Sequence, residues 1–274
     1  MTDFTLQNES SLRLGFFLSI LLFMMAVEAL FPRKRRALGR GHRWFSNILL
    51  TIVDAVFVRL VFPIVAIGAA AIAAQKGWGL FNLVDLPIWL EITFVIILLD
   101  MLIYWQHVAF HHVPFLWAFH KVHHVDRDID VTTGFRFHPI EIGISLAYKL
   151  ALVVLLGVPV LAVIIFEIIL NGCAMFNHSN VKLPLALDRI MRRIIVTPDM
   201  HRVHHSTVMS ETNSNYGFNL SLWDRIFGSY TAQPKHGHDD MVIGLKEYQT
   251  DGPASFSWSL LLPFKAIKRL ERWL

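Results

Sequence analysis

Two short segments of this sequence carry histidines at a spacing that suits metal binding. The pattern H-x-x-H-H occurs twice, at His120, His123 and His124 and again at His201, His204 and His205. On an α-helix, positions i, i+3 and i+4 lie on one face, so each triplet can direct three imidazoles toward one point. Because only 14 of the 274 residues are histidine, two coincidental matches are improbable, and the pattern indicates metal ligands.

Further histidines extend this set. His107 and His111 are four residues apart, which places them on one helical face, and His178 stands at the end of a later apolar segment. Eight or nine imidazoles exceed the ligands of one tetrahedral ion, so the sequence predicts two ions with four or five nitrogens each. The alternative is a cluster of pH-sensing or hydrogen-bonded core histidines, which would repel one another when protonated.

Five histidines fall outside this set. His138 precedes Pro139, which favours an extended backbone, and it could be a ligand, a substrate contact or a structural cap. His112 is expected to face away from the pair at His107 and His111. Three others stand in hydrophilic segments and are expected to be solvated: His42, His236 and His238.

Asp100 is the first polar residue expected to support the histidines. It lies seven residues before His107 in an apolar stretch, where a charge is costly. It either accepts the free N–H of a ligating imidazole, which fixes the tautomer of that ring, or pairs with Arg59 in a neighbouring span. Both interpretations stay open at the level of sequence.

Three further polar residues are candidates for the same supporting role. Glu167 and Asn171 share one helical face with His178. Asn215 begins a predicted turn, Asn215–Gly217, and either serves as scaffold or donates a hydrogen bond to a ligand histidine. Trp223 and Asp224, in the same stretch, are expected to close a cap over the metals.

The ligand types narrow the chemistry. Zinc hydrolases with an H-E-x-x-H motif and carboxylate di-iron bundles with Glu-x-x-His are excluded, because neither pattern occurs. Iron with mostly imidazole ligands is left, and its natural task beside a membrane is oxygen activation on the unreactive C–H bonds of lipids. No side chain is expected to act as a catalytic nucleophile, so catalysis is assigned to the metal pair.

The elements that position these residues are predicted to be membrane helices. The chain is 54% hydrophobic and 17% charged, with a mean hydropathy of +0.49, which is unlike a soluble domain. Its single cysteine, Cys173, excludes an internal disulfide and paired-thiolate zinc sites. The net charge of +4 comes from basic residues beside apolar segments, where lipid headgroups explain them, and no nucleic-acid motif is present.

The first half of the chain contains three predicted spans, at residues 12–31, 46–74 and 87–105. A basic run, Arg33–Arg43, follows the first span and should be cytoplasmic, so the chain returns to the cytoplasm at His107. The first span lacks the charge order of a signal peptide and is expected to be a retained anchor.

The apolar stretch Ile140–Asn171 is broken by Gly157–Pro159 into two short pieces. A single long span would put the second histidine cluster on the opposite side of the membrane, whereas a helical hairpin returns it to the same side. We expect the hairpin. Two later amphipathic segments, LALDRIMRRIIV and LLPFKAIKRLERWL, are expected either at the membrane interface or packed on the protein's own cap.

The predicted fold is therefore all-α: a multi-pass membrane protein with about four transmembrane elements, a helical hairpin and a cytosolic histidine-rich helical cap. Three regions are expected: transmembrane helices in residues 1–106, a di-metal catalytic region in 107–230 with its hairpin at 140–177, and a C-terminal tail with an interfacial helix in 231–274.

The histidine segments and their neighbours occur in a recognisable order: YWQHVAFHH, FLWAFHKVHHVD, FRFHPIE, FNHSN, TPDMHRVHHS and NSNYGFNLSLWDRIFGSY. In these motifs the sequence resembles the fatty acid hydroxylase / sterol desaturase superfamily, in the bacterial branch similar to alkylglycerol monooxygenase. The resemblance implies a membrane enzyme with a di-iron centre that uses O₂ to hydroxylate, desaturate or cleave lipids. Carried onto this chain, it implies nine metal ligands: His107, His111, His120, His123, His124, His178, His201, His204 and His205.

The implied cofactors are two Fe²⁺ ions, which zinc can replace in purified protein, with O₂ as co-substrate. The ligand count stays open, since one further position could be taken by His138, Asn180 or water. Electrons are expected from a separate reductase or a pterin, because no dinucleotide, flavin or iron–sulfur motif is present. The expected location is the bacterial inner membrane, with the histidine motifs on the cytoplasmic side. The competing hypothesis is a metal transporter or metal-binding membrane protein without oxygenase activity.

Overall fold

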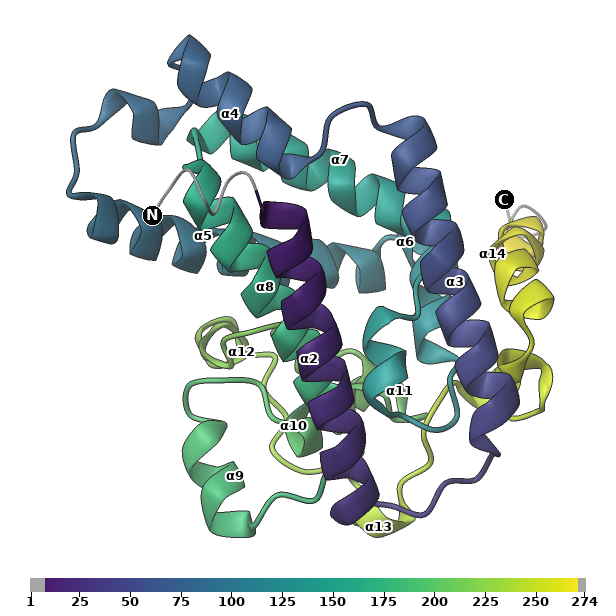
Figure 1. Ribbon diagram of the computed structural model, residues 1–274. Coiled ribbons are helices and arrows are strands. Elements are labelled where there is room, and N and C mark those ends of the chain that lie inside the picture. The colour runs from purple at the N-terminus through teal and green to yellow at the C-terminus, as the bar shows by residue number, and fades with distance from the viewer. Residues whose placement is uncertain (1–7, 271–274) are drawn as a thin grey trace.

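The computed structural model describes residues 8–270, with side chains described as far as Lys265. Within that range every regular element is a helix, and the only β-pairing among the described residues is three isolated bridges. Figure 1 shows the long helices α4, α5 and α7 in its upper half and the short helices α9, α10 and α13 gathered below them. The predicted all-α class is confirmed.

Among the described residues, five helical segments are long and apolar enough to cross a membrane: α2 (Glu9–Leu30), the stretch Arg40–Leu83, α5 (Ile88–His112), α7 (Pro139–Leu156) and α8 (Val160–Asn177). Large apolar side chains on their outer faces are exposed, among them Leu22, Leu60 and Trp89. Such exposure is costly in water and suits lipid contact. The chain is an integral membrane protein, as predicted.

The predicted span at residues 46–74 is not one helix. It divides into α3 (Arg40–Val61) and α4 (Ala66–Lys76), with Pro63 in the non-helical link. Proline lacks the N–H that a helix interior needs, and it disfavours helical geometry in the residue before it. The chain therefore turns here, and α4 packs along α7 (Figure 1).

The apolar stretch that follows the first histidine cluster forms two helices. α7 ends at Leu156, Gly157 adopts the left-handed conformation with φ 67°, and α8 begins at Val160 after Pro159. The chain at Gly157 also approaches Trp78 and Gly79 so closely that a Cβ on Gly157 would clash with the Trp78 carbonyl and one on Gly79 with the backbone of Gly157. Glycine is needed at this turn for both reasons. The chain therefore doubles back, as the hairpin hypothesis expected.

Buried apolar side chains of α4, α5, α7 and α8 form the core that holds these helices together, including Ala70, Val95, Val153 and Phe166. Small alanines on α4 allow close approach to α7 and α8. This core fixes α5 and α8, whose ends carry histidines of the predicted site.

The two amphipathic segments behave differently. α9 (Leu185–Met191) leaves Leu185 and Ile190 exposed, at 78% and 63% of their surface, which agrees with an interfacial position. α14 (Phe256–Leu270) packs on α6 (Pro114–His124) and α3 and buries Leu262, which agrees with packing on the protein itself. Residues 271–274 of the predicted C-terminal helix lie outside the described residues.

Candidate metal centre

Helix ends deliver the predicted histidines to one place. His107 and His111 lie in the last two turns of α5, and α6 begins directly after α5 with Pro114 in its first turn. His178 is the C-terminal cap of α8. α10 (Pro198–His204) carries the second motif, with His205 as its C-terminal cap, and its first turn is capped by the Thr197 hydroxyl, which accepts the Met200 N–H at 3.4 Å.

All nine histidines are buried, and their nitrogens form two adjoining groups. We call them the five-histidine group (His107, His111, His120, His124 and His204) and the four-histidine group (His123, His178, His201 and His205). Within each group the candidate ligand nitrogens lie within 4.8 Å of one another. The rings of His124 and His205 stack across the boundary with centroids 4.5 Å apart. Both H-x-x-H-H motifs contribute to both groups, so they converge on one site.

Backbone carbonyls orient several of these rings. His107 Nδ1 lies 2.8 Å from the carbonyl oxygen of Tyr216, and His204 Nδ1 lies 2.7 Å from that of Ser214. In the four-histidine group, His178 Nδ1 lies 2.7 Å from its acceptor, the Ala174 carbonyl. A carbonyl can only accept, so each Nδ1 carries the proton and each Nε2 presents a lone pair to the centre of its group.

The lone pairs meet without a proton between them. His178 Nε2 lies 3.0 Å from His123 Nε2, whose ring is likewise held through Nδ1 by the Arg136 carbonyl at 3.2 Å. Two imidazole lone pairs at this distance repel, and a cation between them converts the repulsion into coordination. His201 Nε2 lies 2.9 Å from the same His178 nitrogen and would join that coordination. The donor set of the four-histidine group therefore fits a metal ion.

Unpaired nitrogen atoms show that the five-histidine group also fits a metal ion. Nε2 of His107, His111, His120, His124 and His204 is buried and has no hydrogen-bond partner among the described residues. Buried polar atoms normally have partners, so a converging set of unpaired ones requires a ligand. The residues present fit an ion held by nitrogen here as well.

The electrostatics keep the rings in the metal-binding form. Burial lowers the pKa of His120 and of His178 to about 3. Burial, with repulsion from the neighbouring imidazoles, also lowers the pKa of His124 and His205 well below the usual value. Neutral imidazole is the form that coordinates metals, so the site needs no deprotonation at neutral pH.

Glu141 is a functional residue that sequence reasoning missed. It lies in the first turn of α7, only 3% exposed, and its Oε1 is 2.5 Å from Nδ1 of His120. Its carboxylate orients the His120 ring, as the backbone carbonyls orient His107, His204, His178 and His123. An acidic residue at the start of an apolar, membrane-length segment was the available signal, since such residues are costly there.

Asp100 contacts neither an imidazole nor Arg59 within the described chain. Its carboxylate accepts the indole N–H of Trp223 at 2.8 Å and the backbone N–H groups of Asn219 and Leu220 at 3.3 and 3.1 Å. It therefore ties the loop that follows the second motif to α5. The sequence located an unusual carboxylate correctly but not its partner, because the loop becomes a neighbour only in the folded chain.

Glu167 and Asn171 also have partners other than histidine. The Glu167 carboxylate accepts from Lys149 at 2.9 Å and from Arg13 at 2.7 Å. Asn171 donates to the Glu167 carbonyl at 2.8 Å and lines a pocket beside the histidines. Both residues lie on the face of α8 that the sequence indicated, but they are nearer the start of the helix than His178, which caps its end.

Asn215 is scaffold in this structure. It adopts a left-handed φ of 51°, and its amide donates to the carbonyls of Met200 and Thr231 at 2.9 and 2.8 Å. The predicted turn is closed by Asp224, which accepts the backbone N–H groups of Tyr216 and Gly217. The turn and Ser214 before it present the carbonyls that hold His107 and His204.

His138 and Asn180, the two candidates for a further ligand position, lie in neither group. His138 Nδ1 accepts the Ile140 N–H at 3.1 Å and caps α7, while its Nε2 lies 3.2 Å from the carbonyl of Leu260 on α14. Asn180 donates to the Lys34 carbonyl and accepts the Lys34 N–H. For His138, the structural-cap interpretation agrees with the geometry.

The remaining histidines are mostly exposed, as predicted. His42 and His236 are exposed, and His112 points away from the groups with its Nε2 3.0 Å from the Tyr216 hydroxyl. The prediction for His238 was wrong, because its ring is buried beside Asp199, and burial lowers its pKa. Short helix α13 (Gly237–Asp240) folds over α10 in a way that no local pattern indicated.

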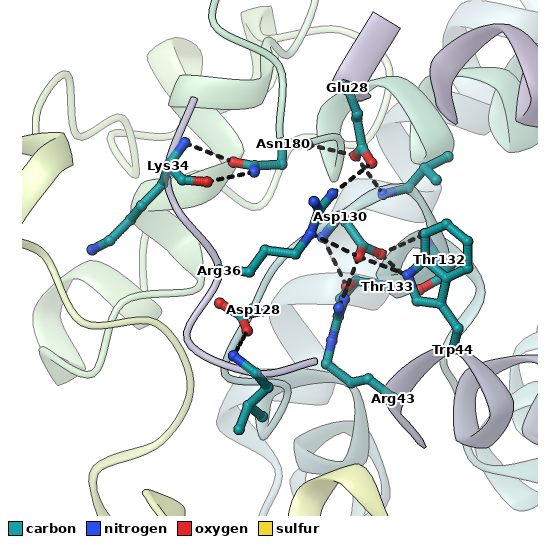
Figure 2. A network of polar contacts seen from close by, with 12 residues as sticks. Glu28, Lys34, Arg36, Arg43, Trp44, Asp128, Asp130, Thr132, Thr133 and Asn180 are labelled. Carbon is teal, nitrogen blue, oxygen red and sulfur yellow. Dashed lines mark hydrogen bonds and ion pairs between the residues drawn. The ribbon is translucent and has the colours of Figure 1, made fainter. Parts of the chain in front are cut away.

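A buried ion network supports the first motif. Arg43, fully buried at the start of α3, donates to Asp126 at 2.6 Å and to Asp130 at 2.8 Å. Figure 2 shows Asp130 also receiving bonds from Trp44 and Thr132. Asp126 follows His124 by two residues, so this network anchors the end of α6.

A pocket of about 200 Å³ opens beside the five-histidine group. His107 and His120 line it together with side chains of α5, α7 and α8. Its apolar wall includes Ile103, Phe110 and Leu170. The site is therefore reached from a cleft between membrane helices, which suits an apolar or amphipathic substrate.

Comparison with known proteins agrees with this geometry. The fatty acid hydroxylase family model matches residues 92–229, just over half of the chain, which include all nine histidines. The chain belongs to the fatty acid hydroxylase family. The predicted family and the predicted enzyme class, an oxidoreductase, are confirmed.

Several curated relatives share this region. An ornithine lipid hydroxylase, OlsE of Rhizobium tropici, is 28% identical over 237 residues, covering 83% of this chain and 69% of that protein. Human alkylglycerol monooxygenase is 31% identical over 143 residues, covering 52% and 30%. Mouse lathosterol oxidase is 32% identical over 139 residues, covering 48% and 42%. The chain thus matches less than half the length of the last two, and no solved structure matches it significantly.

Proposed function

We propose that this fatty acid hydroxylase family member is a membrane-bound oxygenase that uses O₂ and external electrons to hydroxylate, desaturate or oxidatively cleave a lipid. The observation that supports it most strongly is the pair of buried histidine groups, whose unpaired nitrogens converge beside a pocket between membrane helices. The names of the relatives, lipid hydroxylases, monooxygenases and a sterol oxidase, agree with it.

The five-histidine and four-histidine groups would each hold one iron ion. All nine ligands are neutral nitrogens, a donor set that suits iron or zinc and does not suit magnesium or calcium. Bound iron would supply activation of O₂ for attack on an unreactive lipid C–H bond. The chain's own part is to hold the rings in one tautomer, keep water out and bring the lipid to His107 and His120.

The arrangement also suggests how electrons and lipid arrive from different sides. The pocket lies between α5, α7 and α8, within the membrane-spanning part of the chain. The second motif lies on α10, among the short helices outside it (Figure 1). We place this cap on the cytoplasmic side of a bacterial inner membrane, where the basic segment after α2 also lies and a separate reductase has access.

The test is metal analysis of anaerobically purified protein with Mössbauer spectroscopy, followed by lipidomics under ¹⁸O₂ of cells with and without the protein. We expect about two irons per chain and a lipid that either carries the label or, for a desaturation, has lost two hydrogens. Protein that binds metal firmly but changes no lipid would contradict the oxygenase assignment and favour the metal-binding alternative.

A further inference from the structure

The pocket beside the five-histidine group is small for a lipid substrate. Its volume is about 200 Å³, whereas pockets that enclose a drug-sized ligand have roughly 300–1,000 Å³. It can therefore enclose one end of a lipid, while the rest stays in the bilayer. The chemistry of its wall indicates which end that is.

Polar side chains follow one face of α7 along this pocket. Glu141, Ser145 and Lys149 are spaced by four residues and all line it. At helical rise they cover about 12 Å, from the carboxylate that holds His120 to an ammonium group. A pocket built for the middle of an acyl chain would not have a polar stripe of this length, because polar groups are costly within a membrane.

Two of the polar atoms in the wall are unpaired. Glu141 gives one oxygen to His120, but its Oε2 is buried and has no partner among the described residues. Gln106 Nε2, from α5 on the other wall, is likewise buried and unpaired in the part of the chain that the structure describes. One is an acceptor and one a donor, both next to His107 and His120. Such atoms call for a polar ligand.

The far end of the stripe carries an ammonium group with donors to spare. Lys149 and Arg13 share one carboxylate, Glu167, at 2.9 and 2.7 Å, and Arg13 also pairs with Glu9 at 3.2 Å, so the charges of this cluster balance. Lys149 Nζ has three donors, of which this ion pair uses one. An ammonium group lining a pocket in a membrane segment is suited to bind an anion.

We propose that the pocket admits a lipid by its polar head region, with an anionic carboxylate or phosphate bound at Lys149 and neighbouring polar atoms bound by Gln106 and Glu141. This rests on the proposed function and deepens it: the oxidised carbon then lies in or near the headgroup rather than in the middle of an acyl chain. Lys149 is a specificity-determining residue, and it does not take part in the chemistry.

The test is binding of defined lipids to the purified full-length protein in a neutral detergent, measured by native mass spectrometry. The probes are oleic acid as oleate, 1-oleoyl lysophosphatidic acid, and neutral monoolein, so that each carries one oleoyl chain. We expect both anionic probes to bind about tenfold or more tightly than monoolein, the effect of a charge-assisted hydrogen bond. The tighter of the two identifies carboxylate or phosphate as the anion.

Variants connect this preference to the pocket. Lys149→Met should remove it, and Lys149→Arg should keep it. The Met variant should fold, since Arg13 still pairs with Glu167. Arg35→Met, in the exposed basic segment, is the matched control for non-specific attraction and should keep the preference.

Two results would overturn the proposal: equal binding of monoolein in the wild type, or an unchanged preference in Lys149→Met. Because the assay measures binding and requires no turnover, failure of this proposal can be distinguished from failure of the proposed oxygenase function. A protein that shows the Lys149-dependent preference but oxidises no lipid would support this pocket assignment and count against the oxygenase.

Discussion

The five-histidine group and the four-histidine group both draw on α6 and the second motif but have different surroundings. The first lies beside the pocket, and four of its rings are oriented by a carboxylate, an amide and two carbonyls. The second contributes no residue to that pocket, and the acceptors of His123 and His178 are backbone carbonyls. The difference indicates that one ion would face the substrate and the other would be enclosed by the fold.

The ion pairs beside the two motifs also differ in how deeply they are buried. After the first motif, Arg43 and its two carboxylates are almost completely buried. Before the second motif, Asp199 pairs with Arg33 at 3.1 Å, with 13% and 11% of the side chains exposed. An ion pair depends more on both partners being present the more completely it is buried, because water then screens less of the charge that is left behind. The first motif should therefore be the more sensitive to loss of its support.

The largest expected effect is loss of a ligand from either group. His120→Ala and His123→Ala should each lower iron from about two equivalents to about one and reduce activity by more than about 100-fold, the upper range for residues that only support ligands. Iron analysis with a lipid oxidation assay measures both. His236→Ala, at an exposed site, is the control. If His123→Ala kept both equivalents, that residue would leave the ligand set.

The next largest effect concerns stability and compares the ion pairs beside the two motifs. Arg43→Met leaves Asp126 without an ion pair in the described chain and Asp130 with only Arg36, at 3.7 Å, and should lower the free energy of unfolding by about 3–5 kcal/mol. Arg33→Met should cost less, because Asp199 is partly exposed to solvent and keeps Arg202 at 3.6 Å. Thermal unfolding in detergent measures the difference.

The double variant Arg43→Met/Asp130→Asn serves as the control for the first support. It should regain part of the lost stability, because it removes one of the two buried carboxylate charges that Arg43 balances in the wild type. Equal losses for Arg43→Met and Arg33→Met would show that the two motifs are supported alike.

The smallest effect concerns metal affinity and should distinguish the two histidine groups through a residue that supports only one of them. Glu141→Gln keeps the size of the side chain but weakens the bond to His120, so one metal equivalent should bind about 10–100-fold more weakly while the other is unchanged. Chelator titration followed by metal analysis resolves the two sites. Glu247→Gln, an exposed change, should leave both as they are. Parallel weakening of both equivalents would mean that the two groups are not independent sites.

The positions of the histidines could be predicted because helical periodicity is local. His120, His123 and His124 are brought together by the helix itself, and so are the three histidines of the second motif. The hairpin was predictable for a similar reason, since Gly157 and Pro159 restrict the backbone wherever they occur. The break at Pro63 could have been predicted by the same argument.

The partners of the polar residues could not be predicted in this way. Asp100 and Trp223 are 123 residues apart, and nothing in either segment indicates the contact. Glu141 contacts His120 across the turn between α6 and α7, whereas His138, three residues earlier, was the more conspicuous candidate. Each assignment depends on long-range packing, which one sequence does not display.

The sequence by itself determined that the chain is helical, that it lies in a membrane, and that its imidazoles are spaced for metal binding, because composition and periodicity act over a few residues. Only the tertiary structure decided how the nine rings divide into groups, since each H-x-x-H-H helix directs some rings to one group and some to the other. That division depends on the rotation of α6 and α10 about their axes. Distant contacts, including the Arg43 network and the turn at Asn215, fix this rotation.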